Sequence, residues 1–182
     1  MIAKAITKFL DTPYDNRDSG ISCEFVRLNE EWGVKCYPMR EDRDHTYFCQ
    51  RLAAESGLAP KVREKFTIRR DELTLYGYLT QVIRETVKDR MREAGYGNIR
   101  GGRRWVHSAH YHNLYTSLAS IGFTPMDMHW ANVGYLHGKI VCIDFSHFLH
   151  PQAPYASDWS EDYGGPKNVR KPSCSFDSSI LE

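Results

Sequence analysis

The feature that most constrains this chain is a polar loop followed by an apolar strand that ends on an acidic residue. The loop contains Asp127 and Asn132, and the strand, Lys-Ile-Val-Cys-Ile-Asp-Phe, contains Asp144. A turn at His137-Gly138 predicts a small hairpin beside which these three side chains converge. An unpaired carboxylate at the end of a buried strand is costly, so a metal partner is favoured for Asp144. Carboxylate and amide oxygens suit Mg²⁺, and an aspartate free of metal could accept a proton from an attacking hydroxyl.

The spacing of these residues matches a known pattern. D-x-H-x-x-N followed by I-D-F resembles the catalytic loop and metal-binding segment of the protein-kinase-like superfamily, in the branch that includes aminoglycoside and choline kinases. The resemblance implies that Asp127 is the catalytic base, and that Asn132 and Asp144 hold Mg²⁺ on the phosphates of ATP. It also implies that His129 lies near the transferred phosphate, and a loop histidine bonded only to a carbonyl is an equal alternative.

The upstream half extends the resemblance over about residues 18–148. Alternating side chains on either side of Asn-Glu-Glu-Trp-Gly predict a β-hairpin. The hairpin resembles strands two and three of a kinase N-lobe, which implies that Lys35 contacts the α- and β-phosphates. By the same resemblance Gly20 belongs to the glycine-rich loop, and main chain near Tyr78 to Gln81 meets the adenine.

The sequence also departs from the family pattern. Gly20 is the only glycine where GxGxxG is expected, and the helical carboxylate that should pair with Lys35 is not evident, with Glu41, Asp44 and Glu55 as candidates. Few residues follow Asp144 to build the lower helices of an ordinary C-lobe. A pseudokinase or nucleotide-binding interaction protein is therefore one alternative to an ATP-dependent phosphotransferase, and transfer of AMP by the same fold is another.

The expected fold class is α+β, a reduced bilobal protein-kinase-like fold with a small antiparallel N-lobe sheet and a truncated, mainly helical C-lobe. Residues 1–80 would form the N-lobe, including a helix over 41–56 that ends at Gly57. Residues 81–150 would form the reduced C-lobe with the catalytic loop. Residues 151–182 are polar and rich in proline, glycine and serine, and they predict a flexible tail.

Four further segments carry structural predictions. Lys-Phe-Thr-Ile-Arg-Arg and Glu-Leu-Thr-Leu-Tyr-Gly-Tyr-Leu-Thr predict two strands that meet near Arg70-Asp71. Apolar residues from Leu79 to Met91 follow a helical period and predict a helix over that stretch. The glycine-rich segment 95–104 lacks the phosphate-loop pattern and predicts a connector. Residues 105–121 predict one helix that ends at Gly122.

Composition restricts the partners. The 182-residue chain has a net charge of +1, which argues against a general polyanion binder. Residues 61–104 carry 12 basic and 6 acidic side chains, and we interpret this excess as a solvated surface, with a nucleic-acid-binding module as the rival from another class. In the antibiotic-kinase branch a separate lobe encloses the small substrate, and this chain has no room for such a lobe. A protein acceptor is therefore favoured over a small-molecule one.

The cysteines and the N-terminus bear on the compartment. The five cysteines form no CxxC pair and are expected to be reduced, which favours the cytoplasm and disfavours structural zinc. No apolar run is long enough to span a bilayer, and the N-terminus lacks an export signal. The economy of the chain suggests a phage product or bacterial effector acting in the host cytoplasm.

Overall fold

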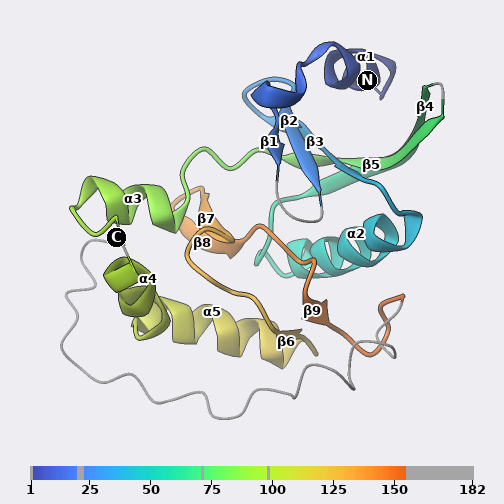
Figure 1. Cartoon of the computed structure of the whole chain (residues 1–182). Helices are drawn as coiled ribbons and strands as arrows, with labels where there is room; N and C mark the ends of the chain where they lie inside the picture. The colour runs from blue at the N-terminus through green and yellow to red at the C-terminus, as the bar shows by residue number, and fades with distance from the viewer. Residues whose placement is uncertain (1, 20–22, 71, 98, 155–182) are drawn as a thin grey trace.

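The computed structural model describes residues 2–19, 23–70, 72–97 and 99–154, and they form an α+β fold, which confirms the expected class (Figure 1). The largest unit is a five-stranded antiparallel sheet with the strand order β1-β2-β3-β5-β4. Its strands are β1 (Asp18–Ser19), β2 (Glu24–Arg27), β3 (Trp32–Tyr37), β4 (Val62–Arg70) and β5 (Leu73–Gln81). The predicted hairpin corresponds to β2 and β3, and the two later predicted strands correspond to β4 and β5.

The two faces of the sheet are covered by different helices. Strand β3 alternates, so Val34 and Cys36 face one side, whereas Lys35 and Tyr37 face the other. The first side packs against α1 (Ile2–Asp11), whose Phe9 is fully buried. The second side packs against α2 (Arg40–Glu55), and Figure 1 shows α1 and α2 on opposite sides of the sheet. A short 3₁₀ turn (Tyr14–Asn16) follows α1.

Helix α2 matches the helix expected over 41–56. Acidic Glu41 and Asp42 lie in its first turn, where they interact favourably with the helix dipole. At the other end Gly57 adopts a φ of 71°, and its amide donates to the carbonyl of Ala54 while the amide of Leu58 donates to Ala53. This pair of bonds satisfies carbonyls that the end of the helix would leave open, and it needs a residue that tolerates a left-handed backbone.

The remaining elements form a mainly helical part below the sheet in Figure 1. Its core contains buried side chains of α2 together with Trp105, Leu118, Phe145 and Phe148. Two small antiparallel ribbons complete it, one joining β6 to β9 and the other joining β7 to β8. The elements are α3 (Val87–Glu93), α4 (Ile99–Val106), α5 (Ala109–Ser120), β6 (Thr124–Pro125), β7 (Val133–Leu136), β8 (Lys139–Cys142) and β9 (Phe148–Leu149).

The helix predicted from Leu79 to Met91 is wrong for its first half. Leu79 and Gln81 belong to β5, where they pair with β3, and α3 begins only at Val87. The start is fixed by a capping box, because the Thr86 hydroxyl accepts from the amide of Asp89 and the Asp89 carboxylate accepts from the amide of Thr86. Strand pairing therefore outweighs the helical spacing of the apolar residues.

The connector expected over 95–104 and the single helix expected over 105–121 are also corrected. Helix α4 includes most of the glycine-rich segment, and it ends before α5 begins. Ser108 separates the two helices, because its hydroxyl donates to the carbonyl of Trp105 and accepts from the amide of Tyr111. The indole ring of Trp130 and the carbonyl of Tyr96 lie so close to Gly101 that no larger side chain fits there, whereas Gly102 makes only ordinary contact with the indole.

The boundary of the expected tail shifts toward the C-terminus. Ala153 is buried, and the two ring nitrogens of His45 in α2 lie 2.8 Å from the carbonyl oxygens of Phe148 and Pro154. Ala153 and Pro154 therefore belong to the folded part. The rest of the expected tail, 155–182, lies outside the described residues.

Candidate active site

The loop between β6 and β7 is held by contacts along its length. The indole nitrogen of Trp105 donates to the carbonyl of Met128 at 3.0 Å. The carbonyl of Trp130 accepts from the amide of Lys88 at 3.1 Å. The loop is thus attached to α4 on one side and α3 on the other, so the polar side chains between these points have a defined position.

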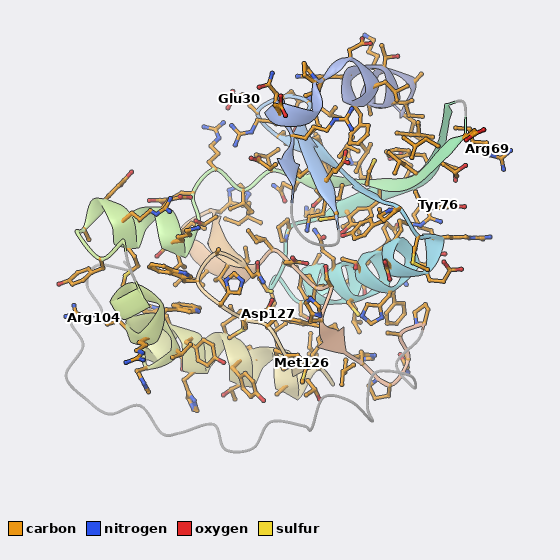
Figure 2. The ribbon with its side chains drawn as sticks, in the orientation of Figure 1. Glu30, Arg69, Tyr76, Arg104, Met126 and Asp127 are labelled. Atoms are coloured by element: carbon orange, nitrogen blue, oxygen red, sulfur yellow. The ribbon has the colours of Figure 1, made fainter. Side chains whose placement is uncertain are left out.

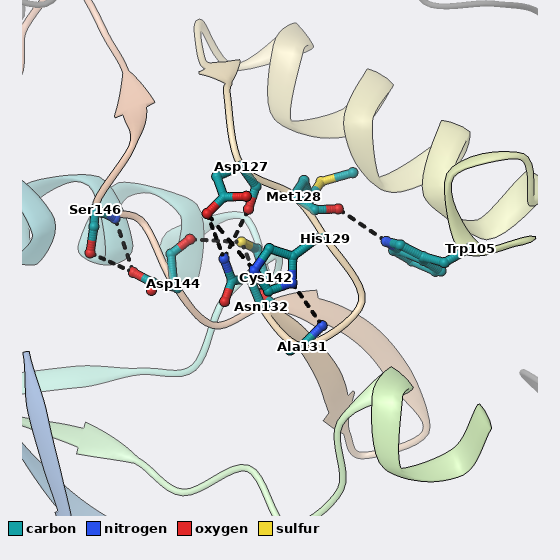
Figure 3. A network of polar contacts seen from close by, with 9 residues as sticks. All are labelled: Trp105, Asp127, Met128, His129, Ala131, Asn132, Cys142, Asp144 and Ser146. Carbon is teal, nitrogen blue, oxygen red and sulfur yellow. Dashed lines mark hydrogen bonds and ion pairs between the residues drawn. The ribbon is translucent and has the colours of Figure 1, made fainter. Parts of the chain in front are cut away.

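Asp127 and Asn132 are hydrogen-bonded to each other across this loop (Figure 3). The Asn132 amide nitrogen donates to the carbonyl of Asp127 at 3.0 Å and to its carboxylate Oδ2 at 3.2 Å. Because the nitrogen is used in this way, the amide oxygen of Asn132 is the atom left to meet a ligand. The Asp127 side chain remains 43% exposed, so solvent or an acceptor group can reach it.

The β7–β8 ribbon brings Asp144 next to Asn132. The ribbon turns at His137 and Gly138, whose φ angles of 51° and 75° match the positive values that a tight two-residue hairpin requires. Beyond β8, the amide of Ile143 donates to the carbonyl of Asn132 at 2.8 Å. The expected hairpin is therefore present, although β8 ends two residues before Asp144.

Asp144 is held as an anion. Its Oδ1 accepts from the amide of Ser146 at 3.0 Å and from the Ser146 hydroxyl at 2.7 Å. Burial alone would raise the pKa of this carboxyl, yet the nearby Lys35 ammonium and the two bonds from Ser146 hold the pKa below its usual value. These two bonds fix the orientation of the carboxylate.

Lys35 reaches the same place from the sheet. Its ammonium donates to the carbonyl oxygen of Ile143 at 2.7 Å. Burial by itself would lower the pKa of Lys35, but the neighbouring Tyr78 and Asp144 raise it above the ordinary value of a lysine. The site therefore contains a fixed positive charge from β3 and a fixed negative charge from the segment after β8.

A cavity of about 300 Å³ lies between these groups. Lys35, Asn132 and Asp144 line it together with Gln81 and Ile83 from the end of β5 and the segment that follows. Lys35 and Ile143, which are 108 positions apart in the chain, thus line the same cavity. Three of the polar residues that were expected to bind phosphates and metal meet at this cavity. Gln81, which was expected near the adenine ring, also lines it.

Two expected catalytic residues lie beside this cavity rather than on its wall. Asp127 is joined to it through Asn132, and Figure 2 shows it near the middle of the view, well apart from Glu30 and Arg69. His129 is 50% exposed, its Nε2 is 3.9 Å from Asp127 Oδ2, and its Nδ1 accepts from the amide of Ala131. The ring of His129 is therefore oriented by its own loop.

The two remaining residues that were expected to contact the nucleotide are Tyr78 and Gly20. Tyr78 is fully buried, and its main chain is flanked by Lys35 of β3 and Lys65 of β4, so its backbone groups are not free to meet a base. Of the expected stretch near Tyr78 to Gln81, it is Gln81 and Thr80 that reach the cavity. Gly20 lies outside the described residues.

The acidic candidates on α2 do not pair with Lys35. Asp44 instead forms ion pairs with Lys65 at 2.7 Å and Arg43 at 2.9 Å, and Glu55 is 3.8 Å from Arg51. The sequence analysis also missed Ser146, which binds Asp144. A serine two residues after an aspartate is a common Asx-turn arrangement, and that signal could have identified it.

The polar groups fit a hard divalent cation with few protein ligands. Asn132 offers its amide oxygen, and Asp144 offers a carboxylate whose pKa is lowered. Mg²⁺ is bound by one or two such groups and completes its shell with water and phosphate. Among the described residues no cluster of three or more His, Cys, Asp or Glu side chains forms a closed metal cage.

Comparisons with known proteins add no identity. No protein-family model matches the chain, and no curated protein matches it in sequence. Within the described ranges, no helix combines the length and apolar character needed to cross a bilayer.

The cysteines at 23, 36, 49 and 142 are free thiols, and burial raises their pKa values.

Proposed function

We propose that this protein transfers the γ-phosphoryl group of ATP to a hydroxyl of another protein, using a reduced bilobal kinase-like fold. The observation that carries the proposal is the convergence of Lys35, Asn132 and Asp144 on one cavity, with Asp127 bonded to Asn132. Positioning and charge neutralisation account for most of the catalysis in phosphoryl transfer, and a rigid arrangement of this kind suits both.

Each group has a role in this proposal. Lys35 binds phosphate oxygens, Asn132 and Asp144 hold Mg²⁺, and Asp127 orients the acceptor hydroxyl and takes its proton. Mg²⁺ would supply charge neutralisation on the phosphates. Because Asp127 is partly exposed whereas Asp144 is held beside Lys35, the two carboxylates are suited to different tasks. His129, half exposed beside Asp127, would contact the transferred phosphate.

The first experiment measures nucleotide binding. ATP with Mg²⁺ is titrated into the whole chain, and calorimetry measures binding while thermal unfolding measures the melting temperature. The melting temperature should rise with ATP concentration and reach a plateau. Asp144→Asn should lose most of the effect, and Asp11→Asn, at an exposed site on α1, should retain it. If wild type shows no stabilisation at millimolar ATP, the proposed function is rejected.

The second experiment measures transfer. The protein is incubated with a host-cell lysate and either γ-labelled or α-labelled ATP, and the labelled species are separated and identified. Label on a protein from the γ position supports the proposal. Label from the α position alone indicates transfer of AMP, and label on a small molecule changes the acceptor class.

A nucleotide-binding protein without transfer activity is the second candidate. The observation that favours it is the bond between the Lys35 ammonium and the main-chain carbonyl of Ile143, which occupies a donor that a triphosphate would use. Binding of ATP without labelling of any acceptor would support this candidate over the first.

A further inference from the structure

Lys35 has a close neighbour on the sheet that the proposed function does not use. It lies directly opposite Tyr78 across β3 and β5, so both side chains point to the α2 face of the sheet. Tyr78 is fully buried, and burial raises the pKa of its hydroxyl to about 12 although the Lys35 ammonium opposes this change. The hydroxyl is therefore neutral near Lys35 at physiological pH.

Gln50 connects this hydroxyl to α2. The Tyr78 hydroxyl donates to Gln50 Oε1 at 2.9 Å, and Gln50 Nε2 donates to the Thr80 hydroxyl at 2.7 Å and to the carbonyl of Pro60 at 3.0 Å. Gln50 is fully buried, and both ends of its amide are bonded. Its orientation is thus fixed, and a buried polar network that is satisfied throughout rigidifies its surroundings.

The direction of the Tyr78 bond matters for Lys35. Because the hydroxyl gives its proton to Gln50, its oxygen can only accept from other groups, and the Tyr37 hydroxyl oxygen lies 3.4 Å from it on the same face of the sheet. The α2 carboxylate of Asp44 is engaged with Lys65 and Arg43, so α2 meets Lys35 through neutral groups. The ammonium donates to the Ile143 carbonyl, and Asp144 and Tyr78, its cross-strand neighbour, both raise its pKa.

We propose that Gln50 and Tyr78 are positioning residues that form a neutral link through which α2 holds Lys35 at the cavity. The link joins the middle of α2 to the wall lined by Lys35 and Asp144. The inference deepens the proposed function, because it rests on Lys35 contacting the nucleotide there. A displacement of α2 would act on Tyr78 through its bond to Gln50, and so on Lys35, the cross-strand neighbour of Tyr78.

The test distinguishes loss of this link from a general loss of folding. Tyr78→Phe removes one oxygen atom and Gln50→Leu removes its acceptor, while Tyr47→Phe is the matched control, since the Tyr47 ring contacts Tyr78 without belonging to the link. An amine-directed acylating reagent labels exposed lysines, and peptide mass spectrometry measures the labelling of Lys35. We expect Tyr78→Phe and Gln50→Leu to increase that labelling several-fold and the double variant to add nothing further.

Nucleotide affinity gives the second readout. If the link positions Lys35, Tyr78→Phe should weaken binding of ATP with Mg²⁺ about tenfold while Tyr47→Phe leaves it unchanged. Labelling needs no nucleotide, so a protein that fails to bind ATP would reject the proposed function and still test the link. Unchanged Lys35 labelling in Tyr78→Phe, or additive effects in the double variant, would overturn the inference. Tyr78→Phe keeps the test decisive if Gln50→Leu does not fold.

Discussion

The ammonium of Lys35 lies 2.7 Å from the carbonyl oxygen of Ile143, the residue that precedes Asp144. This bond fastens the sheet to the segment after β8 at the point where the cavity forms. It also keeps a positive charge beside the Asp144 carboxylate, whose pKa is lowered in part for that reason. The pair therefore links the stability of the fold to the charge state of the site.

The first prediction concerns acid stability. The pKa of Asp144 is lowered in the folded protein, so its ionised form contributes stability above the ordinary value of 3.8, and this contribution is lost as pH falls through the lowered value. Lys35→Met removes the nearby positive charge, so the pKa of Asp144 rises and acid unfolding begins at a higher pH. Circular dichroism from pH 7 to 2 measures the midpoint. Lys61→Met, at an exposed site, is the control, and equal shifts in both variants would contradict the prediction.

The second prediction separates the two aspartates. Asp127→Asn preserves shape and removes the base, so the transfer rate should fall on the order of 10²–10⁴-fold while affinity for ATP stays near wild type. Asp144→Asn should weaken binding of ATP with Mg²⁺ as well as turnover. Steady-state kinetics and calorimetry distinguish the two. Full activity with asparagine at position 127 would remove Asp127 from the role of base.

The third prediction tests how α4 supports the site loop. A methyl group at Gly101 would collide with the carbonyl of Tyr96 and the indole of Trp130, whereas one at Gly102 would lie 3.7 Å from that indole. Gly101→Ala should therefore destabilise the fold by about 1–3 kcal/mol. Gly102→Ala is the matched control and should be neutral or stabilise by up to about 1 kcal/mol through helix propensity. Urea unfolding of both variants measures the difference, and equal stabilities would show that this packing contributes little.

The fourth prediction places the end of the folded unit. The ring nitrogens of His45 lie 2.8 Å from the carbonyl oxygens of Phe148 and Pro154, so a chain cut after Ser157 should still unfold cooperatively near the wild-type temperature. A chain cut after Leu149 loses the Pro154 contact and buried Ala153, and should melt at a lower temperature. Scanning calorimetry compares them. A large loss of stability on cutting after Ser157 would mean that residues beyond it contribute to the core.

Local patterns predicted several elements correctly. Period-two alternation identified β2 and β3, and the Gly57 signal identified the end of α2, because these features depend on neighbouring residues along the chain. Where local spacing competed with distant contacts, the prediction was wrong. Leu79 fits a helical period, but strand pairing with β3 keeps it in the sheet. Helix α1 was not predicted, although Ile2, Ala5 and Phe9 follow a helical spacing.

The sequence by itself singled out Asp127, Asn132 and Asp144 as candidate residues of one site, because their order and spacing can be seen along the chain. The resemblance already grouped Lys35 with them, but only the tertiary structure decided how Lys35 reaches the site, since its partner Ile143 is far away in the chain and the bond exists only after the sheet packs on the helical part. It also decided that α2 contributes Gln50, bonded to the cross-strand neighbour of Lys35, Tyr78, whereas the α2 carboxylate of Asp44 pairs with Lys65. Contacts between distant residues arise from packing geometry, which no local pattern contains.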